Sequence, residues 1–131
     1  MSDTVLLFAQ LNERFALLRP QRIVGNLDQN SFIFVSRLRF NVLTWQDVTD
    51  LVLEHLGGTF LAPGDLFVVT IRDTDGVPWL LATFHGDSNG LSTQPAMIAL
   101  REIAQTKFAD HVLLAGIDAN TRSLVKSFLH K

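Results

Sequence analysis

The stretch from Trp79 to Thr121 constrains the fold of this chain more than any other part of it. Residues 79–84 form an apolar run that ends abruptly in polar residues. Helical spacing of apolar residues follows over 93–107, and a second apolar run, residues 111–115, also ends in polar residues. Two buried strands joined by a helix predict a parallel strand–helix–strand unit, whose two polar ends emerge at one edge of the sheet. Ligands of open α/β sheets bind at that kind of edge.

The polar residues at these two strand ends are suited to binding a metal ion or a phosphate. They are His85, Asp87 and Asn89 after the first run, and Asp118 and Asn120 after the second. On extended backbone, Asp118 and Asn120 point the same way, so the carboxylate can hold a hard divalent cation while the amide orients a water or a phosphate oxygen. His85 could donate to phosphate or carry a proton. The alternative for each is an ordinary turn, cap or structural role.

The composition restricts the class of protein. The chain has 131 residues, the size of one domain. It is 47% hydrophobic and 18% charged, with ten phenylalanines and no tyrosine. This indicates either a dense core or an apolar surface that another chain covers. A net charge of −2 provides no general electrostatic attraction to nucleic acid. The sequence leaves open whether the chain binds nucleic acid. The absence of cysteine excludes disulfides, thiol nucleophiles and cysteine-ligated zinc.

The sequence predicts no membrane span, because no apolar run approaches the roughly 20 residues that a spanning helix needs. The first residues lack the basic segment of a signal peptide. We therefore expect a soluble intracellular protein, with the organelle undecided.

The remaining elements are predicted from periodicity and turn residues, and together they indicate an α/β fold. The expected strands are residues 4–9, 22–25, 31–40, 65–72 and 78–84, and the expected helices are 12–18, 44–56 and an amphipathic tail at 121–130. The run 32–35 is apolar on both faces, which predicts a sheet covered on both sides. Asp75-Gly76 predicts a hairpin. Arg37 and Arg39 are expected on one face of the 31–40 strand, as a solvated edge or a phosphate contact.

Two segments, Phe84–Leu91 and Leu113–Thr121, resemble the middle of the endonuclease/exonuclease/phosphatase superfamily. In that family a strand ends in a histidine, and a helix and a Gly-Asp-x-Asn motif follow. His85 matches the histidine, and Asp118 and Asn120 match the motif. The resemblance implies a two-sheet α/β sandwich and Mg²⁺- or Mn²⁺-dependent hydrolysis of a phosphate-ester substrate. It also implies that Asp118 serves the metal and the attacking water, and that Asn120 holds the phosphate.

The sequence departs from the family at three places. Leu11 follows Gln10 where the family has a metal-binding glutamate, and Glu13 lies two residues further on. Gly116 is one position further from Asp118 than in the motif. The family's final Asp-His pair is expected well downstream of Asn120, beyond the last residue here. We therefore expect residues 1–131 to form a single domain that is an incomplete version of this fold.

Two functional hypotheses follow from the resemblance and its departures. The first is a divalent-metal-dependent phosphoester hydrolase-like protein that is inactive or incomplete as given, with His85, Asp118 and Asn120 as catalytic residues and Asp87 and Asn89 as phosphate contacts. The alternative is a noncatalytic structural or interaction subunit, a pseudoenzyme whose apolar surface is covered by protein partners in a larger assembly.

Overall fold

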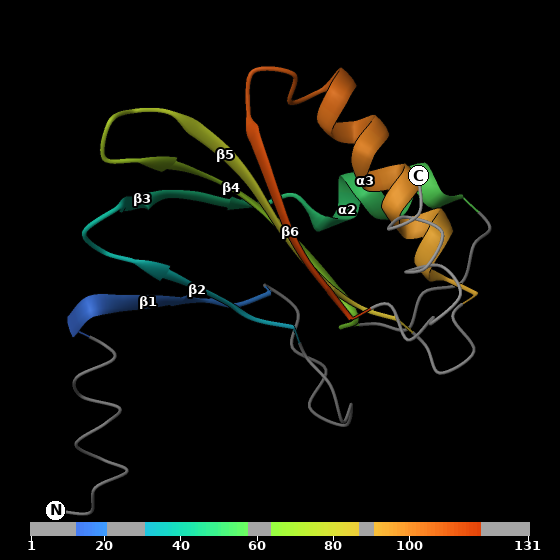
Figure 1. The fold of residues 1–131 in the computed structure, drawn as a ribbon, viewed down its shortest axis with the longest axis horizontal. Helices are drawn as coiled ribbons and strands as arrows, with labels where there is room; N and C mark the ends of the chain where they lie inside the picture. Colours follow the sequence, from blue (N-terminus) through green and yellow to red (C-terminus); the bar gives the residue numbers. More distant parts are fainter. Residues whose placement is uncertain (1–12, 21–30, 58–63, 87–90, 119–131) are drawn as a thin grey trace, which may run out of the picture.

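A computed structural model describes residues 13–20, 31–57, 64–86 and 91–118, and these form an α/β fold with two sheets and two helices. In chain order the elements are β1 (Phe15–Leu18), β2 (Ile33–Ser36), β3 (Phe40–Asp47), α2 (Thr49–Leu56), β4 (Leu66–Asp73), β5 (Pro78–His85), α3 (Thr93–Thr106) and β6 (Val112–Asp118). Figure 1 shows both helices on one side of the larger sheet, with β1 and β2 on the other side.

The larger sheet has four strands in the order β3-β4-β5-β6, and β1 pairs with β2 in a separate two-stranded sheet. The pairs β3–β4 and β4–β5 are antiparallel, whereas β5 and β6 are parallel and joined through α3. The predicted strand–helix–strand unit is therefore confirmed. The parallel pairing brings the ends of β5 and β6 to one edge of the sheet.

One face of the four-stranded sheet packs against the helices. Alternate residues of β4 and β5 point to this face, and α3 contributes apolar residues at helical spacing. The buried members are Val52, Leu66, Val68, Leu80, Ala82, Phe84, Ala96, Ala99, Leu100 and Ile103. Burial of each large apolar side chain contributes about 1.5–3 kcal/mol, so this cluster holds β5 and α3 firmly in place.

The other face of the same sheet packs against β1 and β2. This second cluster consists of Ala16, Leu18, Val35, Phe67, Val69, Ile71 and Leu81. Two edge-to-face aromatic pairs lie at its border, Phe40 with Trp79 and Trp45 with Phe67, with ring centroids 5.8 and 6.5 Å apart. Since β4 contributes to both clusters, its residues from Leu66 to Val69 are all buried.

The prediction of a helix over residues 12–18 holds for residues 13 and 14 and is wrong for residues 15–18. Phe15–Leu18 is a strand, paired antiparallel with β2 so that Ala16 lies opposite Val35. Helical spacing of leucine and phenylalanine favoured a helix, but the cross-strand pairing decides the conformation of so short a segment. The predicted strands at 4–9 and 22–25 and the tail at 121–130 lie outside the described residues.

The predicted strand over 31–40 is two strands separated by a turn. β2 ends at Ser36, whose carbonyl accepts a hydrogen bond from Arg39 N at 3.2 Å, and β3 begins at Phe40. Arg37 and Arg39 are therefore turn residues instead of neighbours on one strand face. The prediction of a sheet covered on both sides is also wrong for β2, because Phe34 is 60% exposed.

The helix predicted with Thr44 as its N-cap begins four residues later, with Val48 as the N-cap and Thr49 as the first helical residue. Thr44 lies in β3, where its hydroxyl accepts a hydrogen bond from Arg72 N and donates one to the Asn41 carbonyl. At the true start, the Thr49 amide and hydroxyl both donate to Asp47 Oδ1. Gly57 ends α2 with a φ of 62°, as expected for a glycine at a helix C-terminus.

The hairpin predicted at Asp75-Gly76 is confirmed, and it joins β4 to β5. Gly76 has a φ of 81°, which a residue with a side chain rarely adopts. The Asp73 carboxylate organises the turn by accepting hydrogen bonds from the amides of Asp75 and Val77 and from the Trp79 indole. The indole bond, followed by those amides, lowers the pKa of Asp73 below its ordinary value of 3.8.

None of the helices in the described part of the chain has the length and hydropathy that a membrane-spanning segment requires.

Candidate functional site

His85 and Asp118 are the last residues of β5 and β6, and the parallel register places them directly opposite each other. Phe84 of β5 is buried against the helices and Leu81 of β5 is buried on the opposite face, and β6 pairs with β5 from Val112 to Asp118. The polar ends are therefore carried on a rigid support, and α3 fixes the crossover between them. The structure thus brings together the two predicted site residues that it describes.

The two side chains form an exposed electrostatic pair. His85 Nε2 lies 3.6 Å from Asp118 Oδ2, which is longer than a hydrogen bond, and the side chains are 37% and 62% exposed. A pair with this exposure contributes little to stability, since solvent screens the charges. Both groups are therefore accessible to a ligand.

The backbone around this pair is tightly connected to neighbouring strands. Gly86 N donates to the Asp118 carbonyl at 2.6 Å, and His85 N donates to the Asp65 carbonyl at 2.8 Å. Asp65 therefore reaches the same edge of the sheet, which the sequence reasoning did not predict. The signal was present, because an antiparallel hairpin between β4 and β5 must place the residue before Leu66 beside the residue after Phe84.

Three predicted site residues, Asp87, Asn89 and Asn120, lie outside the described residues. Within the described ranges, no group of three His, Asp or Glu side chains could hold a metal ion. Asp118 is the carboxylate whose distance to the His85 side chain is known, and Asp65 reaches the same edge through its backbone. One carboxylate suits a Mg²⁺ or Mn²⁺ ion that keeps several waters and takes further oxygens from a phosphate. The described part of this edge therefore supplies one carboxylate toward such an ion, and not a complete set of protein ligands.

Two other histidines also contact carboxylates. His55 Nε2 contacts Glu102 Oε2, which links α2 to α3. His111 Nδ1 lies 2.8 Å from Asp110 Oδ1, and this contact lowers the pKa of Asp110. Asp110 and His111 immediately precede β6, whereas Asp118 ends it. The two His–Asp pairs therefore lie at opposite ends of one strand and provide matched sites for experiments.

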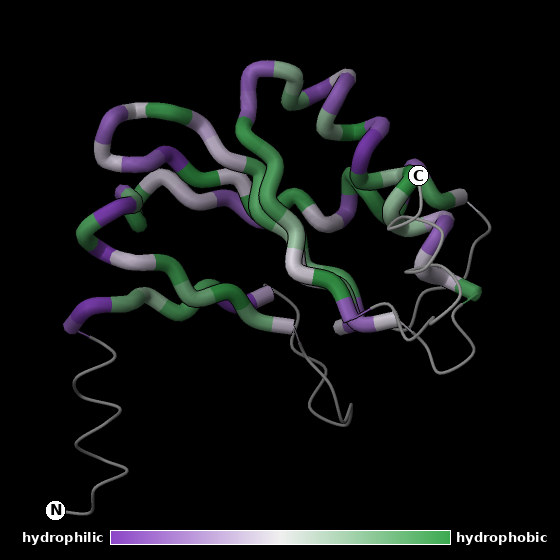
Figure 2. The backbone as a smooth tube through the Cα atoms, viewed as in Figure 1, coloured by the Kyte–Doolittle hydropathy of each residue, from purple (hydrophilic) through white to green (hydrophobic). Residues whose placement is uncertain are grey.

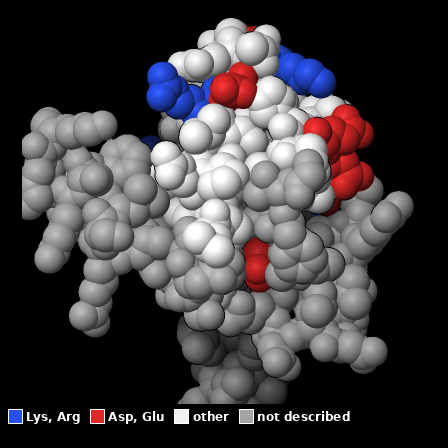
Figure 3. Space-filling model, turned by 90° about the vertical axis from the view of Figure 1, so that its right-hand side faces the viewer, with Lys and Arg blue, Asp and Glu red and all other residues white. Residues whose placement is uncertain are grey.

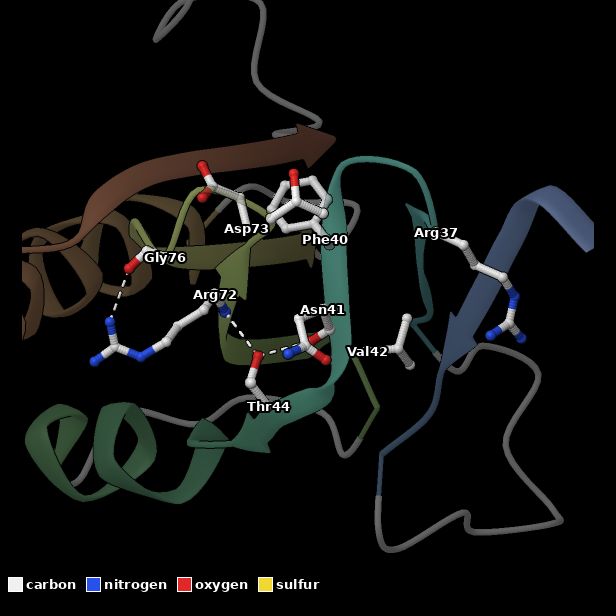
Figure 4. Close-up of a pocket in the computed structure, with 9 residues that line it drawn as sticks. Arg37, Phe40, Asn41, Val42, Thr44, Arg72, Asp73 and Gly76 are labelled. Atoms are coloured by element: carbon white, nitrogen blue, oxygen red, sulfur yellow. Dashed lines mark hydrogen bonds between the residues drawn. The ribbon is translucent and has the colours of Figure 1, made fainter.

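A polar hollow lies beside β3, away from the ends of β5 and β6. Its lining includes Arg37, Asn41, Thr44 and Arg72. Figure 4 shows that the two guanidinium groups point away from each other on opposite sides of β3, and Arg72 Nη1 is bonded to the Gly76 carbonyl at 2.8 Å. Because its two cations do not converge, this hollow is a weaker candidate for a phosphate site than the His85–Asp118 edge.

The charged residues that the structure describes are scattered on the helix-bearing side of the molecule. Figure 3 shows separate small groups of basic and acidic atoms around uncharged surface on this side. An electrostatic footprint for nucleic acid would be a continuous basic stripe, and the described residues on this side form none.

Comparisons of the chain with models of known protein families, with curated proteins and with solved structures found no match.

Proposed function

We propose that this chain is a phosphoester hydrolase-like protein that binds a divalent metal together with a phosphate ester at the His85–Asp118 edge. The observation that carries the proposal is the register of β5 and β6, which sets a histidine opposite a carboxylate at the carboxyl ends of two parallel strands. Under this proposal the layers of helices, larger sheet and smaller sheet correspond to part of the two-sheet sandwich of the endonuclease/exonuclease/phosphatase superfamily.

The site residues would contact either the metal or the phosphate. Asp118 would hold Mg²⁺ or Mn²⁺ through its carboxylate, and Asn120 would assist from two residues further on. His85, Asp87 and Asn89 would contact the phosphate, with His85 donating a hydrogen bond to a phosphate oxygen. The bound metal would supply positive charge that neutralises the phosphate. Since Leu11 replaces the metal-binding glutamate of the family pattern, the expected outcome is binding with negligible turnover.

Binding is tested with Mn²⁺ and phenyl phosphate, by following the broadening of the His85 ring resonances in NMR spectra. We expect broadening only when Mn²⁺ and the ester are both present, and its loss in Asp118→Asn. Asp110→Asn is the matched control, because it removes a carboxylate beside a different histidine at the other end of β6. Equal broadening in Asp118→Asn and the parent chain would refute the assignment of the metal to Asp118.

Turnover is tested separately with bis(p-nitrophenyl) phosphate and Mg²⁺. We expect no hydrolysis above that of Asp118→Asn. Hydrolysis that Asp118→Asn abolishes and Asp110→Asn retains would show an active phosphoesterase and would overturn the expectation drawn from Leu11.

A second candidate function is that of a noncatalytic interaction subunit. The observation that favours it is the exposure of apolar side chains on β6, where Leu114 is 60% exposed. Large exposed apolar groups in a contiguous strand mark interaction surfaces. Under this candidate, Mn²⁺ and phenyl phosphate would leave the His85 resonances unchanged, and the chain would associate through β6.

A further inference from the structure

The β6 strand is an unusually apolar edge of the four-stranded sheet. It ends the strand order, so no strand in the described ranges pairs with its outer side. From Val112 to Ile117 it carries no charge, yet Val112 and Leu113 are 42% exposed, Leu114 is 60% exposed and Ile117 is 37% exposed. Figure 2 shows this strand as predominantly hydrophobic along its length. An edge of this kind offers its outward backbone groups to another strand.

A space for a partner side chain lies on the face of β6 that looks toward β2. Leu114 and Gly116 line an apolar hollow of about 200 Å³ together with Phe34 and Leu81. A Cβ added at Gly116 would meet nothing within 4 Å. Because Leu114 and Gly116 are two residues apart on a strand, they share this face. The strand therefore carries both a protruding leucine and an open position that could receive one.

We propose that β6 pairs antiparallel with β6 of a second copy of this chain, around a two-fold axis at Ala115. In this register Ala115 lies opposite its own symmetry mate, and Leu113 lies opposite the second copy's Ile117. Leu114 lies opposite the second copy's Gly116, so each leucine fills the open position on the other chain. The two four-stranded sheets then form one continuous sheet.

Geometry and charge select this register. A two-fold axis normal to the sheet keeps each face of the sheet on the same side, so opposed positions must differ by an even number of residues. Centring on Ala115 pairs all seven residues of β6 and places Asp118 opposite Val112. Centring on Leu114 would place Asp118 opposite Asp110, and like charges directly opposed destabilise a strand pair.

The charge-free segment also explains why a second copy fits this edge. Two identical chains carry the same net charge of −2, so an interface between them must avoid opposing like charges. The segment between Val112 and Ile117 meets that condition, and its leucines match its glycine and isoleucine when the strand is reversed. This inference does not depend on phosphoester binding at the His85–Asp118 edge.

The test is the concentration dependence of sedimentation velocity for the parent chain and three variants. The parent should form a dimer at micromolar concentration. Gly116→Val fills the open position from within its own chain, and Leu114→Lys puts a charge into the apolar edge. Each should raise the dimer dissociation constant at least about tenfold, because both copies lose the leucine packing. Leu43→Lys is the matched control, since it makes the same change on β3 and should leave the dimer unaffected.

Amide hydrogen exchange gives an independent readout that does not require a variant to fold. Amides of residues 112–118 should become more protected as the parent concentration rises, whereas those of β3 should not. A parent that stays monomeric, or a dimer that Leu43→Lys breaks and Leu114→Lys retains, would overturn the proposal. Growth into larger particles without a dimer would also overturn it, because pairing of β6 with a second β6 uses both edges and stops at two copies. Thermal melts followed by circular dichroism identify any variant that fails to fold. In that case the concentration dependence of amide exchange in the parent tests the dimer.

Discussion

The two outer strands of the larger sheet, β3 and β6, occupy equivalent positions and are built in opposite ways. Along β6 every residue from Val112 to Asp118 is in continuous register with β5. Along β3 the register breaks, because the chain advances five residues from Asn41 to Gln46 while β4 advances only two, from Arg72 to Thr70. The extra residues bulge outward, and Leu43 is 96% exposed at the bulge.

The bulge makes β3 a poor template for another strand. The Thr44 hydroxyl accepts from Arg72 N at 2.9 Å, which replaces a ladder hydrogen bond within the bulge (Figure 4). Asn41 Oδ1 accepts from Leu43 N at 3.2 Å, so a side chain also occupies an amide in the bulge. Proteins protect their sheet edges with bulges and polar side chains of this kind. One edge of this sheet is closed to pairing, while the other is regular and apolar.

The largest effect on the free energy of unfolding should come from β5, which lies inside the sheet. Leu80 on β5 is fully buried, so Leu80→Ala should lower the free energy of unfolding by about 2–5 kcal/mol. Leu43→Ala removes the same atoms from the β3 bulge and should change it by no more than about 0.5 kcal/mol. Urea unfolding of both variants measures the difference. Equal losses would mean that Leu43 is packed, and the contrast between the edges would be lost.

The next effect concerns the point where β3 passes into α2. The Thr49 hydroxyl accepts from the amide of buried Val68 at 3.0 Å. Thr49→Val keeps the shape but leaves that amide without its partner, which should cost about 1–3 kcal/mol of unfolding free energy. Thr49→Ser retains the hydroxyl and should cost less. If urea unfolding shows that Thr49→Ser is less stable than Thr49→Val, the hydrogen bond from the Val68 amide does not stabilise the end of β3.

A smaller effect is expected within the bulge itself. Thr44→Val removes the hydroxyl that accepts from Arg72 N, but the amide is exposed and water can replace the lost acceptor. We expect a loss of about 0.5–1 kcal/mol, and Thr44→Ser should restore most of it. Amide exchange at Arg72 should accelerate in Thr44→Val alone. Unchanged exchange there would show that the bulge protects β3 without this bond.

The smallest effect is a pH dependence at the turn between β4 and β5. The lowered pKa of Asp73 means that its carboxylate stabilises the fold above the ordinary value of 3.8, and that this contribution is lost as pH falls through the lower folded value. The stability advantage of the parent over Asp73→Asn should therefore shrink below about pH 4. Urea unfolding at each pH, followed by Trp79 fluorescence in a Trp45→Phe background, measures this stability difference. Trp79 is a suitable probe because its indole donates to Asp73 Oδ2 at 3.0 Å. If the stability advantage of the parent over Asp73→Asn stays constant down to about pH 2, the ionised Asp73 carboxylate is not what stabilises the turn.

Local sequence signals were sufficient for the second half of the described fold. The runs that became β4 and β5, the Asp75-Gly76 turn and the apolar spacing of α3 each favour one conformation over several consecutive residues. The position of His85 at the end of β5 follows from these signals, whereas β6 extends to Asp118, three residues beyond the predicted run 111–115. Local signals were not sufficient for β1, because Phe15 and Leu18 fit a helical face but lie in a strand that pairs with β2 and packs in the second cluster.

The sequence by itself determined the parallel β5–α3–β6 unit and the residue types at its polar end, because strand length, helical period and turn residues are local properties. Only the tertiary structure decided that His85 faces Asp118 at 3.6 Å, since the register between β5 and β6 depends on how α3 packs. Only the tertiary structure decided that β6 is an edge. An apolar run reads the same whether it lies inside a sheet or at its border, and strand order alone distinguishes the two.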